Sequence, residues 1–237
     1  MTDLTLMEIL RAFVDTDTIA VTFPGYPMSW IELIGTLFYL LSVWLIAKRN
    51  MLTWPSGIVS VVLFFFLFYQ IRLYADALEQ IYYLGACIYG WWFWKREEKI
   101  GAEKVVSVGF SSPGTMAGWA AGTLIASTAG GLFMEKVHLY FPAVFPEAAA
   151  YPFIDTLTTL MSFTAMFLMA RKKTESWIYW IIVDLIGIWL YYMKNVRFIS
   201  VLYVLLLGLA IKGLWHWKTQ PRMGCPQTII PQSSASD

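Results

Sequence analysis

Residues 85–95 read GACIYGWWFWK, and residues 208–218 read GLAIKGLWHWK. The same offset of 123 residues aligns the whole stretch from Ile31 to Lys95 on the stretch from Ile154 to Lys218 without gaps. Shared apolar composition would produce matches of leucine and isoleucine, whereas these two stretches also share tryptophan, glycine and lysine. Self-similarity at a fixed offset indicates an internal repeat. The sequence therefore predicts two similar halves.

The composition predicts an integral membrane protein. Apolar residues make up 58% of the 237 residues, charged residues make up 14%, and the mean hydropathy is +0.59. Soluble domains carry about 25% charged residues, and about 20 apolar residues in a helix are enough to cross the hydrocarbon core of a bilayer. Seven such segments are expected, at residues 30–47, 54–70, 76–94, 115–134, 153–170, 177–193 and 198–217.

The repeat predicts how these segments are arranged. Each half holds three of them, so a direct join would turn the second half upside down. The segment at 115–134 has no counterpart in either half and removes that inversion. We expect an all-α fold of seven transmembrane helices, built as two parallel three-helix repeats joined by one inverting helix (3+1+3). The expected parts are an N-terminal outer segment with a short interfacial helix (1–28), the first repeat (29–95), a linker with the fourth transmembrane helix and an outer loop (96–152), the second repeat (153–218) and a flexible cytoplasmic tail (219–237).

The distribution of positive charge predicts the orientation of the chain. With the N-terminus outside, the inner segments hold twelve of the 17 lysine and arginine residues and the outer segments hold five. Cytoplasmic loops carry the excess of these residues, so we expect the N-terminus outside and the C-terminus in the cytoplasm. A net charge of +1 gives no case for a nucleic-acid partner. Such a unit could act alone or as a homo-oligomer, and the sequence leaves this open.

Asp184 is the strongest candidate for a binding residue in the second half. It lies near the middle of the sixth expected helix, where an ionised carboxylate without a partner costs at least roughly 2.5 kcal/mol. Trp177, Trp180 and Tyr191 share its helical face by their spacing. Trp177 and Trp180 could instead belong to the aromatic belt at the membrane interface, but a belt does not explain Asp184. We therefore favour a ligand-binding wall.

The first half offers polar residues at matching depth. Gln80 and Tyr83 share one face of the third expected helix, and Gln80 aligns with Tyr203 of the second half. Equivalent positions that both carry polar groups are expected where a site lies on the repeat axis. These side chains could equally bond neighbouring helices, a contact of roughly 0.6 kcal/mol in membrane proteins. Gln70, at the outer end of the second helix, and Trp54 are weaker candidates.

Tryptophans also gather near the inner ends of the third and seventh expected helices. Each pair lies next to a lysine, Lys95 or Lys218, and this arrangement is typical of an interfacial belt with snorkelling cations. We assign four tryptophans to that belt: Trp92, Trp94, Trp215 and Trp217.

No enzyme signature is found. The two histidines, His138 and His216, form no paired spacing suited to a metal, and no nucleophile elbow, phosphate loop or dinucleotide-binding motif occurs. We expect no enzyme activity, no cofactor and no metal. Lys212 in the seventh helix allows a light sensor with a retinal Schiff base, or more broadly a seven-helix receptor. It lies two turns from the inner end, however, and snorkelling is the better explanation.

Several stretches resemble known membrane transporters. The plan of two parallel three-helix repeats with one inverting helix resembles the SWEET sugar facilitators. The residues themselves resemble the PnuC family of nicotinamide riboside transporters: TESWIYWIIVD at 174–184, NMLTWPSGI at 50–58, and YYLG at 82–85 followed by GWW at 90–92 and Lys95. The resemblance covers residues 30–218.

The resemblance implies uptake of nicotinamide riboside, a vitamin B3 form, across a bacterial inner membrane by facilitated diffusion. Phosphorylation by a cytosolic kinase would then trap the vitamin. Aromatic rings can stack on a cationic pyridinium, a carboxylate can balance its charge or bind ribose hydroxyls, and glutamine can pair with a carboxamide. Related proteins carry riboflavin or thiamine, and a sugar is a further alternative.

We therefore predict one substrate site near the bilayer midplane, between the two triplets. Rocking of the triplets would expose this site alternately to the two sides. From the second half the lining is expected to comprise Trp177, Trp180, Asp184 and Tyr203. From the first half it is expected to comprise Gln70, Gln80, Tyr83 and Trp54.

Overall fold

The computed structural model describes residue 15 and residues 18–23, 26–71, 74–99, 108–142, 148–149, 151–193 and 197–219. All seven expected helices are present in this part of the chain. The elements, in order, are β1 (Ile19–Phe23), β2 (Tyr26–Ser29), α2 (Trp30–Ala47), α3 (Thr53–Gln70), α4 (Tyr74–Lys99), α5 (Pro113–Tyr140), α6 (Pro152–Ala170), α7 (Ser176–Met193) and α8 (Arg197–Thr219).

The described helices support an integral membrane protein. Five of them are long and apolar enough to cross a bilayer: α2, α3, α6, α7 and α8. Of the other two, α4 carries Asp76 and Glu79 near its start, and α5 is rich in glycine, alanine and threonine. Large apolar side chains are exposed along these helices, as expected where the surrounding solvent is lipid.

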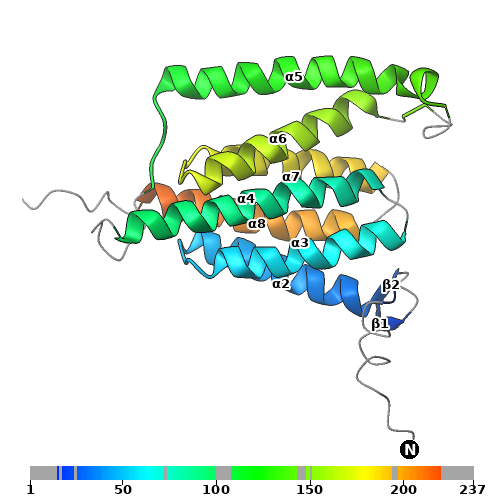
Figure 1. Cartoon of the computed structure of the whole chain (residues 1–237), viewed down its shortest axis with the longest axis horizontal. Helices are drawn as coiled ribbons and strands as arrows, with labels where there is room; N and C mark the ends of the chain where they lie inside the picture. Colours follow the sequence, from blue (N-terminus) through cyan, green and yellow to red (C-terminus); the bar gives the residue numbers. More distant parts are fainter. Residues whose placement is uncertain are drawn as a thin grey trace, which may run out of the picture.

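Six helices pack into a closed ring. Neighbouring pairs follow the order α2, α3, α4, α6, α7 and α8, and α8 returns to α2. The contacts α4·α6 and α8·α2 join residues 30–99 to residues 152–219, so we call residues 30–99 the first triplet and residues 152–219 the second triplet. Helix α5 lies outside the ring, along α6 (Figure 1).

Small residues bring α5 close to α6. A Cβ atom added at Gly131 would collide with the ring of Phe153, and Thr123 and Thr164 share a hydrogen bond of 3.0 Å. Tyr179 of α7 also lies near Thr123. Helix α5 therefore packs on the second triplet.

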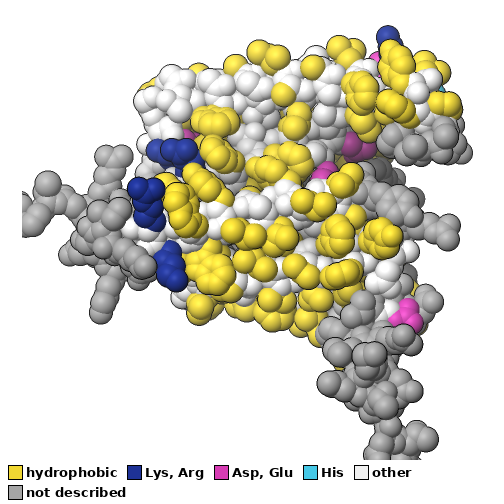
Figure 2. All heavy atoms as spheres, viewed as in Figure 1, with side chains coloured by type: hydrophobic (Ala, Val, Ile, Leu, Met, Phe, Trp, Pro, Cys, Tyr) yellow, Lys and Arg dark blue, Asp and Glu magenta, His cyan; other side chains and the backbone are white. Residues whose placement is uncertain are grey.

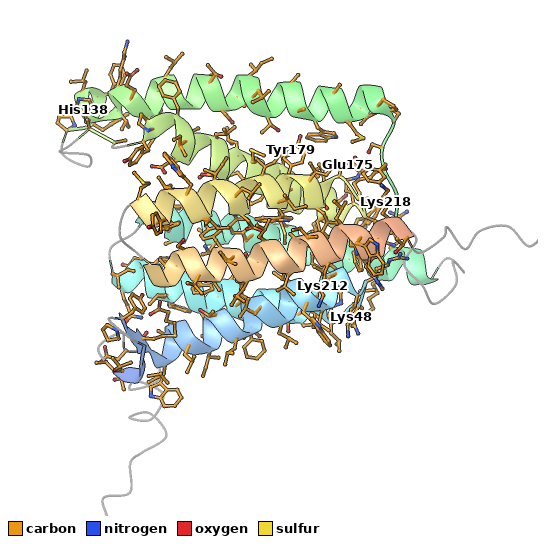
Figure 3. All side chains as sticks on the ribbon, turned by 180° about the vertical axis from the view of Figure 1, so that it is seen from behind. Lys48, His138, Glu175, Tyr179, Lys212 and Lys218 are labelled. Atoms are coloured by element: carbon orange, nitrogen blue, oxygen red, sulfur yellow. The ribbon has the colours of Figure 1, made fainter. Side chains whose placement is uncertain are left out.

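The segment before α5 is attached to the same triplet. The backbone of Gly109 pairs with the turn between α6 and α7: its N–H donates to Lys172 O at 3.2 Å, and its carbonyl accepts from Thr174 N at 3.0 Å. The buried carboxylate of Glu175 accepts from Ser111 N at 3.2 Å. Glu175 and Tyr179 both lie on the side of α7 that faces α5 (Figure 3).

The turns after α2 and α6 have the same geometry. Arg49 and Lys172, which are equivalent under the repeat, both adopt left-handed backbone, with φ of 57° and 60°. Each N–H bonds the carbonyl three residues back, and the next N–H bonds the carbonyl five residues back, which is the Schellman motif. Glycine usually occupies this position, so neither turn was evident from composition.

The two ends of the ring differ in charge. Figure 2 shows most lysine and arginine side chains gathered at one end, the left in this view, with apolar side chains along the flank. Helices α2, α4, α6 and α8 finish there, and we call it the basic end. The opposite end carries the strands β1 and β2, and we call it the hairpin end (Figure 1).

The hairpin corrects the expectation of an all-α chain. Strands β1 and β2 pair antiparallel immediately before α2, within the part expected to be an outer segment with a short helix. The residues proposed for that helix, before residue 15, lie outside the described residues, as does the tail from residue 220. Ser29 ends β2 and caps α2, because its hydroxyl accepts from Glu32 N at 3.4 Å and so satisfies a free helix N–H.

Two helix ends extend beyond their expected bounds. Helix α4 continues to Lys99, into the expected linker, and α5 continues to Tyr140, into the expected outer loop. Pro113 is the first residue of α5, and Ser112 caps the helix by accepting from Thr115 N at 3.3 Å. Proline is favoured at this position because it has no N–H to leave unpaired.

Candidate functional site

Asp184 is buried inside the ring. The side chain is 3% exposed on α7, and no described residue donates a hydrogen bond to its carboxylate. Gly187, one turn later, leaves room for the ring of Tyr203 from α8: a Cβ atom added there would lie 2.6 Å from that ring. Tyr203 also stacks on Tyr191, with ring centroids 5.5 Å apart. Asp184 and Tyr203 thus line one wall.

Two more phenols complete the surroundings of Asp184. Tyr39 of α2 and Tyr203 are electrostatic neighbours of the Asp184 carboxylate. Tyr83 of α4 is in turn an electrostatic neighbour of Tyr39 and Tyr203, and its hydroxyl lies near Ser162 of α6. Five ring helices therefore contribute to one polar group in an apolar interior. We call these residues the central site: Tyr39, Tyr83, Ser162, Asp184 and Tyr203.

Acidic residues lie between the central site and the hairpin end. Glu79 of α4 accepts a hydrogen bond of 3.0 Å from Thr159 of α6. Asp76, one turn earlier on α4, is an electrostatic neighbour of Glu79 and of Asp155 on α6. Among the described side chains of the ring helices, no lysine or arginine lies on this side of the central site. The charged side chains that the structure describes on the ring helices in this region are therefore acidic.

Four tryptophans are buried together near the basic end. Trp54, Trp94, Trp177 and Trp217, from α3, α4, α7 and α8, are each at most 2% exposed and belong to one buried cluster. Trp54 meets Trp94 edge-on with ring centroids 5.2 Å apart, and Trp177 meets Trp217 in the same way at 5.5 Å. We call these residues the tryptophan quartet.

The quartet corrects the assignment of Trp94 and Trp217 to an interfacial belt. Both are buried, and their indole N–H groups donate to backbone carbonyls. Trp92 and Trp215, two residues earlier, are 54% and 67% exposed, as expected of a belt. Two residues turn a helix by about 200°, so one member of each pair faces lipid and the other faces the interior.

The structure divides the eight residues expected to line the site into three groups. Three lie in the central site, three lie in the quartet or against its cluster, and two are glutamines that bond within their own helices. Asp184, Tyr203 and Tyr83 come together in the central site. Trp54 and Trp177 lie in the quartet, and half-buried Trp180 packs against the cluster that contains it. Gln80 is half-buried, and its amide donates to Asp76 O at 3.4 Å within α4. Gln70 is exposed at the end of α3, where its amide donates to Phe66 O.

Two residues of the central site were missing from that set. Tyr39 and Ser162 are equivalent under the offset of 123 residues, so they lie at the same depth on opposite sides of the ring. That equivalence was a usable signal, because polar groups at matched positions indicate a site on a repeat axis. No group of metal-binding side chains occurs among the described residues.

Comparison with known proteins agrees with these observations. Residues 29–219 match the family model described as nicotinamide mononucleotide transporter. The chain is 29% identical over 213 residues to the nicotinamide riboside transporter PnuC of Escherichia coli K12, covering 84% of this chain and 89% of that protein. It is 30% identical over 194 residues to the riboflavin/roseoflavin transporter RibM of Streptomyces davaonensis, covering 81% and 86%.

A solved structure has the same fold. The crystal structure of the vitamin B3 transporter PnuC superimposes with a TM-score of 0.56 over 80% of both chains at 21% identity. The match of the family model spans the whole helical ring and the outlying helix. The chain is a membrane protein that belongs to the nicotinamide mononucleotide transporter family, the family of PnuC.

Proposed function

We propose that this protein takes up nicotinamide riboside across a bacterial inner membrane by facilitated diffusion. The observation that carries the proposal is Asp184, a buried carboxylate to which no described residue donates a hydrogen bond, surrounded by the phenols of Tyr39, Tyr83 and Tyr203. Ionisable groups inside membranes tend to be functional, because burying them is costly. A pyridinium ring supplies a positive charge for the carboxylate and a flat face for the aromatic rings.

Charge favours the riboside over the mononucleotide. The mononucleotide carries a phosphate, and the described groups between the central site and the hairpin end are acidic. Phosphate sites in proteins are usually built from arginine, lysine or helix N-termini. Riboflavin has no positive charge for Asp184 to balance. Thiamine is cationic and stays an alternative that only experiment separates.

In this proposal the binding wall comprises Asp184, Tyr203, Tyr83, Tyr39 and Ser162. Trp180 extends it toward the basic end. In the same proposal the amide of Gln80 pairs with the carboxamide. Trp54 and Trp177 are assigned to the closure at the basic end, and Gln70 is left outside the site.

The proposed architecture is 3+1+3, with the N-terminus outside and the C-terminus in the cytoplasm. Along the chain, α5 comes between the two triplets and runs from the basic end to the hairpin end. Both triplets therefore start at the hairpin end. The charge of the basic end supports placing it in the cytoplasm. Because α5 and residues 108–112 are attached to the second triplet, the two bodies that rock would be α2–α4 and α5–α8. Cytosolic phosphorylation would keep the imported vitamin inside.

Ligand-induced thermal stabilisation of the purified protein tests the cargo. The panel holds nicotinamide riboside, nicotinamide mononucleotide, riboflavin, thiamine and a simple sugar. We expect the riboside to give the largest shift. Asp184→Asn should weaken its binding roughly tenfold or more, since a hydrogen bond to a charged group contributes about 1.5–3 kcal/mol. Glu135→Gln, which changes an exposed acid on α5 outside the ring, is the control.

Two results would contradict the proposal. A riboside shift that is undiminished in Asp184→Asn would remove the central site from binding. In vesicles that lack the kinase, facilitated diffusion should stop when the riboside concentrations inside and outside are equal. Accumulation of the riboside that depends on the proton gradient would instead indicate coupled transport. Lys212→Ala separates the light-sensor alternative: Lys212 is exposed on α8 (Figure 3), and a transporter should tolerate its loss.

A further inference from the structure

The tryptophan quartet consists of two units, one in each triplet. In the first, Trp54 of α3 lies against Gly90 of α4, where a Cβ atom would collide with its ring. In the second, Trp177 of α7 lies against Gly213 of α8, and a Cβ atom there would be 2.6 Å from its ring. Each unit also holds an edge-on tryptophan pair. The contacts within a triplet are therefore close and repeat-related.

Two hydrogen bonds join each unit to the other triplet. Trp94 Nε1 of α4 donates to Ala170 O of α6 at 3.0 Å, and Trp217 Nε1 of α8 donates to Ile46 O of α2 at 3.1 Å. These bonds lie at the two places where the first triplet meets the second in the ring. Separating the triplets at the basic end would break both bonds and leave each unit intact.

The remaining two indoles have unpaired donors. The Nε1 atoms of Trp54 and Trp177 are buried, and no described atom accepts from them. A phenylalanine could fill a permanent core without leaving a buried donor unpaired. Water entering an opened basic end could satisfy these two groups. The Nε1 donors of Trp94 and Trp217 are thus paired in the closed arrangement. The Nε1 donors of Trp54 and Trp177 would find a partner when the basic end opens to water.

The quartet also lies on the line from the central site to the basic end. Trp177 and Asp184 are seven residues apart on α7, which is about 10 Å along the helix axis. The quartet, drawn from four helices and both triplets, therefore lies between the central site and the basic end.

We propose that the tryptophan quartet is the gate at the basic end, and that it opens by breaking the Trp94–Ala170 and Trp217–Ile46 hydrogen bonds while each triplet keeps its own tryptophan-on-glycine unit. The proposal rests on the proposed transport function, because a gate has meaning only if cargo passes. It names the moving boundary and two of the bonds that hold it closed, beside the bond from Arg49 Nη2 to His216 O at 3.3 Å. It does not depend on which vitamin is carried.

Two thiols can report gate opening. Cys87 is buried in the cluster with the quartet, two turns from Trp94 on α4. Ala210, its repeat equivalent on α8, is 2% exposed and can be changed to cysteine in a Cys87→Ala background. The chain with Cys87 and the chain with Ala210→Cys both carry Cys225→Ser as well. A third chain keeps Cys225, which lies six residues beyond the end of α8. Labelling of Cys225 identifies vesicles that present the basic end to the reagent.

The experiment measures the rate at which a membrane-impermeant maleimide labels each thiol from the basic end. Trp94→Phe and Trp217→Phe each keep an aromatic ring and remove one bond between the triplets. Losing one such bond should raise the labelling rate roughly two- to tenfold. Trp92→Phe and Trp215→Phe change exposed tryptophans of the same helices and should leave the rate unchanged.

Labelling that rises in the first two variants and not in the controls supports the gate. An unchanged rate in Trp94→Phe and Trp217→Phe, or an equal rise in all four, would overturn it. If Trp94→Phe and Trp217→Phe do not fold, the chain that keeps the whole quartet still tests the gate. Without added cargo, its thiols must be labelled from the basic end and not from the hairpin end. If nicotinamide riboside gives no thermal shift but the labelling rate responds to the tryptophan variants, only the proposed cargo is rejected. If the riboside is taken up but the labelling rate does not respond, only the gate is rejected.

Discussion

Gly213→Ala should lower the stability of the protein, because Trp177 occupies the space that the new methyl group needs. The added Cβ atom would lie 2.6 Å from Cη2 and Cζ2 of Trp177 and 2.7 Å from Cε2, where ordinary contacts start near 3.4 Å. Trp177 is 1% exposed, so its ring cannot turn aside without displacing its neighbours, including Trp217.

The magnitude follows from two opposing contributions. Overfilling a packed interior costs about 1–3 kcal/mol, whereas alanine favours a helix over glycine by about 1 kcal/mol. Gly208 lies on the same helix with nothing within 4 Å of an added Cβ atom, so Gly208→Ala should show the gain alone. The difference between the two variants isolates the steric cost and corresponds to about 2–12 °C in Tm for a chain of this size.

Thermal unfolding of the purified protein in detergent, followed by the loss of monodisperse protein, measures this difference. The first repeat supplies an independent pair, since Gly90 faces Trp54 and Gly85 has open space around it. Gly90→Ala should therefore melt below Gly85→Ala. If Gly213→Ala melts at or above Gly208→Ala, the close approach of α8 to Trp177 does not limit stability and the reasoning fails.

Three further predictions concern single hydrogen bonds. Glu175→Gln should weaken the attachment of residues 108–112 to the second triplet, because a neutral oxygen accepts less strongly from Ser111 N; it should lower Tm and speed proteolysis of that segment. Thr159→Val should lower Tm as well, because Glu79 loses its donor, and a buried acceptor left unpaired costs about 1–3 kcal/mol. Burial and the neighbouring Glu32 raise the pKa of Tyr26 above its ordinary 10.0. The neutral phenol therefore stabilises the hairpin below pH 10, and this stabilisation disappears as the pH rises further. Tyr26→Phe should remove that part of the pH dependence of Tm.

Each of these variants has an exposed counterpart. Glu135→Gln, Thr128→Val and Tyr140→Phe change the same residue types on α5, where all three side chains are exposed. They should leave Tm and its pH dependence nearly unchanged. Equal effects in a variant and its counterpart would mean that the named hydrogen bond does not contribute.

The sequence was sufficient to predict the seven helices and the burial of Asp184. Helix length and apolar content are properties of each segment alone, so the expected bounds agree with the structure to within a few residues at most ends. Asp184 could be found because a carboxylate in an apolar segment is costly wherever the helix is placed. The hairpin before α2 was missed, since its strands are too short to produce a distinct pattern.

The partners of Asp184 were harder to predict. Tyr203 and Tyr83 were expected, but Tyr39 and Ser162 come from α2 and α6, which approach Asp184 only through the closure of the ring. The exposure of Gln70 at the end of α3 could not be predicted either, because exposure depends on how the helices pack.

The sequence by itself determined the number of helices, the repeat and the buried charge, because each depends on residue type and spacing along the chain. Only the tertiary structure decided which tryptophans face the lipid and which close the ring. Trp92 and Trp94, or Trp215 and Trp217, are equivalent in composition, and lipid and protein interior are both apolar. Hydrophobicity therefore cannot distinguish the two environments in a membrane protein, and the packing of neighbouring helices does.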